Sequence, residues 1–144
     1  MDTIHIREMN ITDIPTLITW GEGEREIWGS DEDKWYDKKG LTKWLNAKGD
    51  DILLVAENHG KLAGMCMLRY MFDEYYCDTL YVHAEHQRLG IGKKLLEEAE
   101  NRMRVKGITL YFLETRQDNA RGVAFYKKFG FKEMHRNIRF EKRI

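Results

Sequence analysis

The residues with the clearest chemical potential form a glycine-rich turn at Gln87–Lys94. The turn separates a predicted strand from a predicted helix. Backbone N–H groups at the start of a helix have no acceptor within the helix, and glycines let a phosphate approach them closely. Arg88, Lys93 and Lys94 place positive charge beside those amides. The turn therefore predicts a phosphate site, and a helix cap with incidental lysines is the alternative interpretation.

The glycine spacing excludes two common nucleotide-binding loops. A Walker A loop requires GxxxxGK followed by Ser or Thr, which this turn lacks. A Rossmann fingerprint requires a third glycine after Gly92, which is also missing. The phosphate ligand is therefore expected to belong to another class of cofactor.

A second block of residues, Glu114–Phe131, follows the next predicted strand. Together the two blocks resemble the GNAT acetyltransferase superfamily. Gln87, Gly90 and Gly92 match the pyrophosphate motif Q/R-x-x-G-x-G/A of that family. The family's late-helix pattern of Asn, Tyr and Gly-Phe is matched by Asn119, Tyr126, Gly130 and Phe131. One departure is Gly122, where the family usually has alanine.

The resemblance implies a GNAT-like α/β (α+β) fold with a mixed, mostly antiparallel central sheet flanked by helices. It also implies acetyl-CoA as co-substrate, with the pantetheine arm added to the sheet as a further strand. The pyrophosphate is then expected on the glycine-rich turn. The implied cofactor-binding residues are Leu80, Tyr81, Val82, Gln87, Arg88, Leu89, Gly90, Ile91, Gly92, Lys93, Lys94, Asn119 and Tyr126.

Acetyl transfer to an amine needs a proton acceptor for the amine and an acid for the departing thiolate. The resemblance assigns Tyr126 as the acid, because a phenol with a pKa of about 10 can protonate a thiolate of similar basicity. It assigns Glu114 as the base. The alternatives are a core aromatic at Tyr126, a salt bridge from Glu114 to Arg116 or Arg121, and Asp78 as the base.

The resemblance identifies the acceptor substrate of the acetyl group less specifically than it identifies the cofactor. Leu113-Glu114 resembles the branch that acetylates protein N-termini, including the ribosomal-protein alanine acetyltransferases. An acetyltransferase of a small amine, of polyamine or aminoglycoside type, is the first alternative, and a non-catalytic acyl-CoA-binding regulatory module is the second. Two acidic stretches, Glu22–Glu26 and Asp31–Asp33, are expected to attract an amine or to be solvated loops. The aromatic residues expected to wall the pocket are Trp20, Trp28, Trp35 and Tyr36, and helical spacing toward the core is the alternative for some of them.

His83 and His86 are close in sequence, but nothing cysteine- or acid-rich joins them, so no metal is predicted. Cys66 and Cys77 lie in predicted strands without CxxC spacing and are expected to be buried, reduced thiols.

Apolar periodicity predicts the order of elements along the chain. The expected strands are 3–9, 51–57, 61–69, 75–83, 108–114 and 131–140. The expected helices begin at a cap near Asn10 or Thr12 and then span 41–47, 92–105 and 120–129.

The length of 144 residues and the 42% hydrophobic content fit one domain, 1–144. The 24 acidic and 24 basic residues balance, which disfavours a nucleic-acid partner. The halves differ, because residues 1–80 carry 16 acidic and 9 basic residues, a net −7, and 81–144 carry 8 and 15, a net +7. No run of 18 apolar residues occurs, so a cytoplasmic protein without a membrane partner is expected. A homodimer that exchanges the last strand is compatible with the sequence.

Overall fold

The computed structural model describes residues 3–22 and 36–144 and divides into two compact units. The first unit is Met1–Glu114 and the second is Thr115–Ile144. The strands are β1 Ile4–Glu8, β2 Ile52–Asn58, β3 Lys61–Met71, β4 Glu74–Val82 and β5 Tyr111–Phe112. The helices are η1 Ile11–Asp13, α1 Ile14–Glu22, α2 Lys38–Asn46, η3 Ala84–His86, α3 Ile91–Val105 and α4 Ala120–Phe129.

The first unit is built on one five-stranded sheet with the order β1-β2-β3-β4-β5. The first four strands pair antiparallel, and β5 lies parallel to β4. The mixed, mostly antiparallel sheet with flanking helices confirms the predicted fold class. The β2–β3 turn is tight, since His59 and Gly60 both adopt positive φ, as a two-residue hairpin loop requires.

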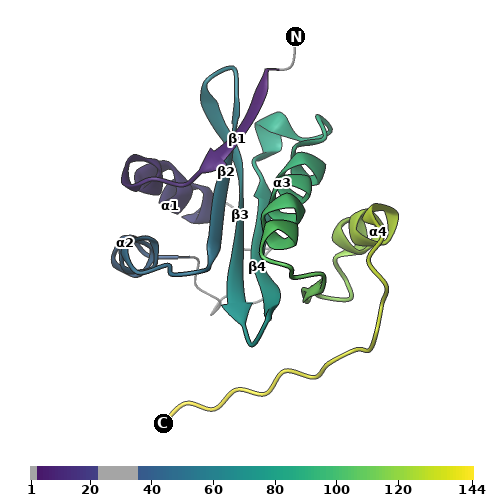
Figure 1. Cartoon of the computed structure of the whole chain (residues 1–144). Coiled ribbons are helices and arrows are strands. Elements are labelled where there is room, and N and C mark those ends of the chain that lie inside the picture. Colours follow the sequence, from purple (N-terminus) through teal and green to yellow (C-terminus); the bar gives the residue numbers. More distant parts are fainter. Residues whose placement is uncertain (1–2, 23–35) are drawn as a thin grey trace. The chain divides into compact units, whose positions relative to one another are not determined.

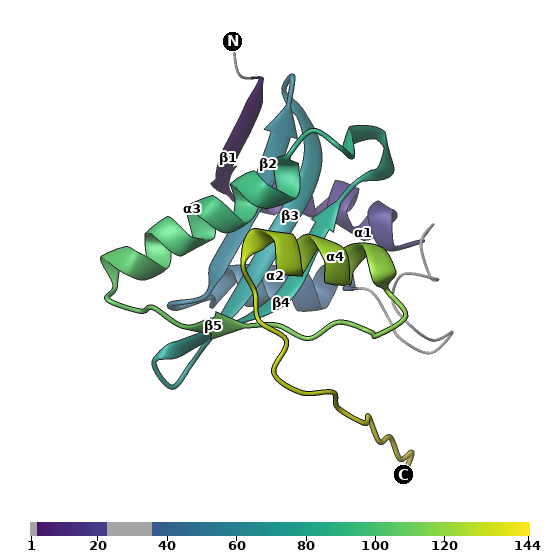
Figure 2. The same cartoon turned by 90° about the vertical axis from the view of Figure 1, so that its right-hand side faces the viewer.

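Helices cover both faces of this sheet. Figures 1 and 2 show α1 and α2 on one face and α3 on the other. On the α1 and α2 face, Leu17 and Leu41 pack with strand residues such as Val55 and Met65. On α3, the buried residues are Ile91, Leu95, Leu96, Ala99 and Met103. This is the predicted apolar face, and burying each large aliphatic side chain contributes about 1.5–3 kcal/mol.

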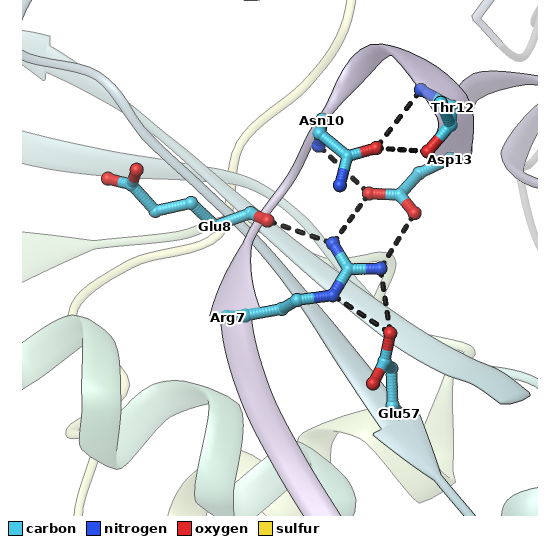
Figure 3. A network of polar contacts seen from close by, with 6 residues as sticks. All are labelled: Arg7, Glu8, Asn10, Thr12, Asp13 and Glu57. Carbon is cyan, nitrogen blue, oxygen red and sulfur yellow. Dashed lines mark hydrogen bonds and ion pairs between the residues drawn. The ribbon is translucent and has the colours of Figure 1, made fainter. Parts of the chain in front are cut away.

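A network of charged groups joins the first strand to the first helices (Figure 3). The Arg7 guanidinium donates to both carboxylate oxygens of Asp13 at 2.8 Å and to Glu57 at 2.9 Å. Asp13 also accepts from the backbone N–H of Asn10, whose own side chain accepts from Thr12. This capping box fixes the chain as it leaves the sheet, as the predicted cap at Asn10 requires.

The second unit contains α4, whose bounds are those predicted. The predicted strand over 131–140 is wrong, because no regular element follows α4 in the second unit. Met134, Ile138 and Phe140 are exposed there. Alternating apolar residues form a strand only when a neighbouring strand accepts their backbone hydrogen bonds, and the pattern cannot supply that neighbour. The strand predicted at 108–114 is likewise shorter, because β5 pairs with β4 only at Tyr111 and Phe112.

Candidate active site

A bulge in β4 shapes the centre of the candidate site. Met67 pairs with Thr79 and Leu68 with Cys77, so Asp78 is the extra residue of the bulge. The bulge lets Asp78 and Thr79 contact one group, the hydroxyl of Tyr36, which lies 2.5 Å from Asp78 Oδ2 and 2.5 Å from Thr79 Oγ1.

Asp78 is held by two neighbours. Its carboxylate accepts the hydrogen bond from Tyr36 and lies 3.8 Å from the Arg69 guanidinium. Burial, with the nearby Asp78 carboxylate, raises the pKa of Tyr36 well above its usual range, so the phenol stays a donor. Arg69 is itself stacked 3.9 Å over the ring of Trp44. These contacts leave the Asp78 carboxylate already engaged by a phenol donor and beside a guanidinium.

Glu114 lies at the end of the same sheet, two residues beyond β5. Its carboxylate and that of Asp78 both act on Tyr76, whose pKa is raised first by burial and then by these two charges. Tyr76 also packs against Phe112, with ring centroids 5.2 Å apart. The sheet therefore brings the two candidate bases to one neighbourhood, and Glu114 is the more exposed of them.

The part of β4 that is predicted to bind the pantetheine arm lies beyond the residues that pair with β5. The parallel pairing of the two strands covers only Tyr75 and Tyr76 on β4. The predicted pantetheine contacts, Leu80, Tyr81 and Val82, lie further along β4, beyond this pairing. The Gln87 amide donates to the Val82 carbonyl at 3.3 Å and so links this end of β4 to the glycine-rich turn.

The glycine-rich turn has the geometry that the sequence predicts. Gly90 is the N-cap of α3, with φ of +77°, and provides no side-chain cap. The first helical bond runs from the Lys94 N–H to the Gly90 carbonyl, which leaves the preceding amides of α3 without an acceptor in the helix. Arg88 and Lys93 are exposed beside them. The N-terminus of α3 can thus receive an anionic group.

Gly64 on β3 lets α3 lie close to the sheet. A Cβ at this position would lie 2.7 Å from the Tyr81 carbonyl oxygen and 3.3 Å from the Ile91 side chain. No side chain larger than hydrogen fits there without a shift. The position of the turn therefore depends on a glycine that the sequence analysis did not single out, although an isolated glycine within a strand is a signal of close backbone approach.

The late motif lies in the second unit. Asn119 is the N-cap of α4, since its Oδ1 accepts from the Gly122 N–H at 3.1 Å and its Nδ2 donates to Thr115 at 3.0 Å. A Cβ at Gly122 would lie 2.3 Å from the Asn119 amide nitrogen, so an alanine there requires the Asn119 side chain to shift. Tyr126 contacts Phe125 and Phe131 edge-to-face, with centroids 5.4 and 5.5 Å apart.

The remaining predicted residues divide into two groups. Trp20 is buried, lies tilted against Tyr81 and stacks on His83. Cys66 and Cys77 are buried and free, as predicted. Most of the two acidic stretches, with Trp28 and Trp35, lies outside the described residues. No helix among the described residues is long and apolar enough to cross a membrane.

Comparison with known proteins agrees with this geometry. A model of the Acetyltransferase (GNAT) family matches residues 16–131. The spermidine N(1)-acetyltransferase of Thermoplasma acidophilum is 31% identical over 151 residues, covering 90% of this chain and 89% of that protein. The ribosomal protein bS18-alanine N-acetyltransferase of Salmonella typhimurium is 28% identical over 134 residues, covering 92% and 82%.

A solved structure shares the fold over nearly the whole chain. The crystal structure of PaiA N-acetyltransferase from Thermoplasma acidophilum in complex with coenzyme A superposes with a TM-score of 0.74 at 27% identity. The match covers 93% of this chain and 92% of that one. The chain belongs to the GNAT family of acetyltransferases. It is an acetyl-CoA-dependent N-acetyltransferase, as the resemblance implied.

Proposed function

We propose that this enzyme transfers the acetyl group to a primary amine of a polyamine, by direct attack in a ternary complex. The observation that carries the choice of acceptor is the similarity to a spermidine acetyltransferase along 90% of the chain. The net −7 of residues 1–80 supports it, because acidic surface attracts a polycation. A protein N-terminus is the second candidate, supported by the likeness to a ribosomal-protein alanine acetyltransferase.

We propose that the cofactor lies along Leu80–Val82, with its pyrophosphate on Gln87–Lys94. The pantetheine amides would hydrogen-bond to backbone at the end of β4, and the α3 amides with Arg88 and Lys93 would hold the pyrophosphate. Asn119 caps α4, so its support of the cofactor is through the position of Tyr126 on that helix.

In the proposed reaction, the neutral amine attacks the thioester carbonyl carbon and the carbon–sulfur bond breaks. Glu114 accepts the amine proton, directly or through water, and Tyr126 donates its hydroxyl proton to the thiolate. Glu114 is favoured over Asp78 because Asp78 already accepts a hydrogen bond from Tyr36 beside Arg69. Thr79, where many family members carry an acid, also contacts Tyr36 and is not proposed as a base.

We further propose that residues 1–144 act as one domain in the cytoplasm. The two free, buried cysteines are typical of a reducing compartment. A homodimer is proposed through association of the segments 131–140, because contact between two copies would cover the exposed Met134, Ile138 and Phe140. Sedimentation velocity measures this directly, and a monomer across micromolar concentrations would refute it.

The function is tested by acetyl transfer from acetyl-CoA to spermidine and to a peptide with an N-terminal alanine. We expect turnover with spermidine, and kcat lowered about 10²- to 10⁴-fold in both Tyr126→Phe and Glu114→Gln. The Glu114→Gln defect should shrink as pH rises, because the acceptor amine then loses its proton unaided. Acetyl-CoA affinity should be unchanged in both variants.

The outcomes separate the alternatives. Turnover of the peptide without turnover of spermidine would identify a protein N-terminus as the acceptor. Binding of acetyl-CoA without turnover of any amine would identify a regulatory module. An unchanged kcat in Glu114→Gln would return the base to Asp78 or to water.

A further inference from the structure

Three side chains around the 3-10 turn η3 form a cluster that acetyl transfer does not use. His83, Glu85 and His86 each offer one ligand atom, and these atoms lie within 4.8 Å of one another. The turn brings them together, because the His86 N–H donates to the His83 carbonyl and closes a single helical turn. The sequence prediction of no metal assumed that no acid joins the two histidines, yet Glu85 does.

His86 is the buried member of this cluster. It is 9% exposed, and its Nδ1 lies 3.2 Å from the amide nitrogen of Asn58. Its Nε2 is buried and has no hydrogen-bond partner among the described residues. A buried imidazole nitrogen without a partner is costly, and such groups in native proteins point to a ligand that satisfies them.

The donor and acceptor roles in the hydrogen bonds from His86 Nδ1 to Asn58 and from Asn58 to Thr3 can be exchanged without losing either bond. Thr3 Oγ1 lies 2.9 Å from the Asn58 carbonyl oxygen, and a hydroxyl serves equally as donor or acceptor. When the Asn58 amide is turned over, its oxygen accepts a hydrogen bond from the His86 Nδ1–H and its nitrogen donates to Thr3 Oγ1. The Nε2 lone pair is then available. A metal-bound histidine typically donates its other ring N–H to such an oxygen.

We propose that His83, Glu85 and His86 bind one divalent transition-metal ion of the Zn²⁺ type. Two imidazoles and a carboxylate match the ligand preference of that ion, and water would complete a tetrahedral set. Closing to bond lengths of about 2.1 Å would come from rotation of the exposed Glu85 and the half-buried His83 side chains toward His86. None of the three ligands is among the residues assigned to acetyl transfer.

One positive charge competes with the ion. Lys61 Nζ lies 3.3 Å from Glu85, at the surface, where side chains of both residues are mostly exposed. Such pairs contribute little and break readily. Trp20 stacks on His83 with centroids 5.6 Å apart, so its fluorescence reports on an ion bound there.

The test is titration of the tag-free, full-length protein with ZnCl₂ by calorimetry, and with CuCl₂ by tryptophan fluorescence. We expect binding of one ion per chain and quenching of the Trp20 emission by Cu²⁺. His83→Gln and Glu85→Gln should each weaken Zn²⁺ affinity at least about tenfold. His5→Gln, an exposed histidine on β1, is the matched control and should bind as the wild type does.

Two results would overturn the proposal. The first is no saturable binding by the wild type up to millimolar Zn²⁺. The second is equal affinity in the wild type, His83→Gln and Glu85→Gln. The melting temperature of each variant without metal shows whether it folds. If His83→Gln does not fold, Glu85→Gln decides the question, because the Glu85 side chain is 63% exposed and its replacement should not disturb the fold. Neither result bears on spermidine acetylation, which is measured separately.

Discussion

Two 3-10 turns in the first unit follow strands in the same way but differ in how their polar groups are satisfied. In η1, the Arg7, Asn10 and Asp13 side chains bond to one another or to nearby backbone, and Asp13 is only 4% exposed. In η3, the N-cap His83 makes no side-chain cap bond and His86 Nε2 has no partner among the described residues. A saturated cluster stabilises the fold, whereas an unsaturated one keeps capacity for a ligand.

The largest effect is expected for Asp13→Ala in the saturated turn. This change leaves the Arg7 guanidinium without its bidentate partner and should lower the free energy of unfolding by about 3–5 kcal/mol. Urea denaturation measures it, and kcat/KM of the folded enzyme should be unchanged. Glu57→Gln is the milder control, because Glu57 is more exposed. A loss below about 1 kcal/mol for Asp13→Ala would contradict the structural role of this network.

The second effect concerns Gly90, at the start of α3. Gly90→Ala should cost about 1–2 kcal/mol through its positive φ and should also weaken acetyl-CoA binding. Gly107→Ala is a matched control at the other end of α3, with φ of +74° and equally open space around the added methyl group. We expect the same loss of stability there with unchanged cofactor affinity, measured by calorimetry. Equal cofactor affinities in the two variants would remove the turn from the binding site.

A smaller effect is expected from charge at the turn. Arg88→Gln and Lys93→Gln should each raise KM for acetyl-CoA about 2- to 5-fold, equivalent to about 0.4–1 kcal/mol. The increase should shrink as salt rises, because these side chains are exposed. Lys43→Gln on α2 is the control with the same loss of charge. A KM for acetyl-CoA that changes neither with these substitutions nor with salt concentration would mean that the backbone amides alone hold the pyrophosphate.

The smallest effect on stability is expected for Lys61→Gln, beside η3. The hydrogen bond and charge of Lys61 lower the pKa of Glu85, and both groups are solvent-exposed. Its removal should leave the melting temperature unchanged and raise the Glu85 pKa toward its ordinary value. Zn²⁺ should then bind more tightly near neutral pH, where Glu85 stays ionised. Weaker Zn²⁺ binding in this variant would show that Lys61 supports the site instead of competing for it.

Much of the fold was predictable from local patterns. The α3 face of Leu95, Leu96, Ala99 and Met103 follows from helical periodicity, and the β2–β3 hairpin follows from Asn58-His59-Gly60. The segment after α4 was not predictable, because alternation describes the side chains of a strand but not the neighbour that pairs with it.

The sequence by itself determined the family, and it predicted the anion-binding character of the glycine-rich turn, since glycines, adjacent cations and a helix start within a few residues act locally. Only the tertiary structure showed that Tyr36 and Arg69 engage Asp78, which is the contact on which the proposal of Glu114 as the base depends. It also showed that Asn58 lies behind His86. The Tyr36–Asp78 and Asn58–His86 contacts join residues 42 and 28 positions apart, and folding alone brings such distant side chains within hydrogen-bond distance.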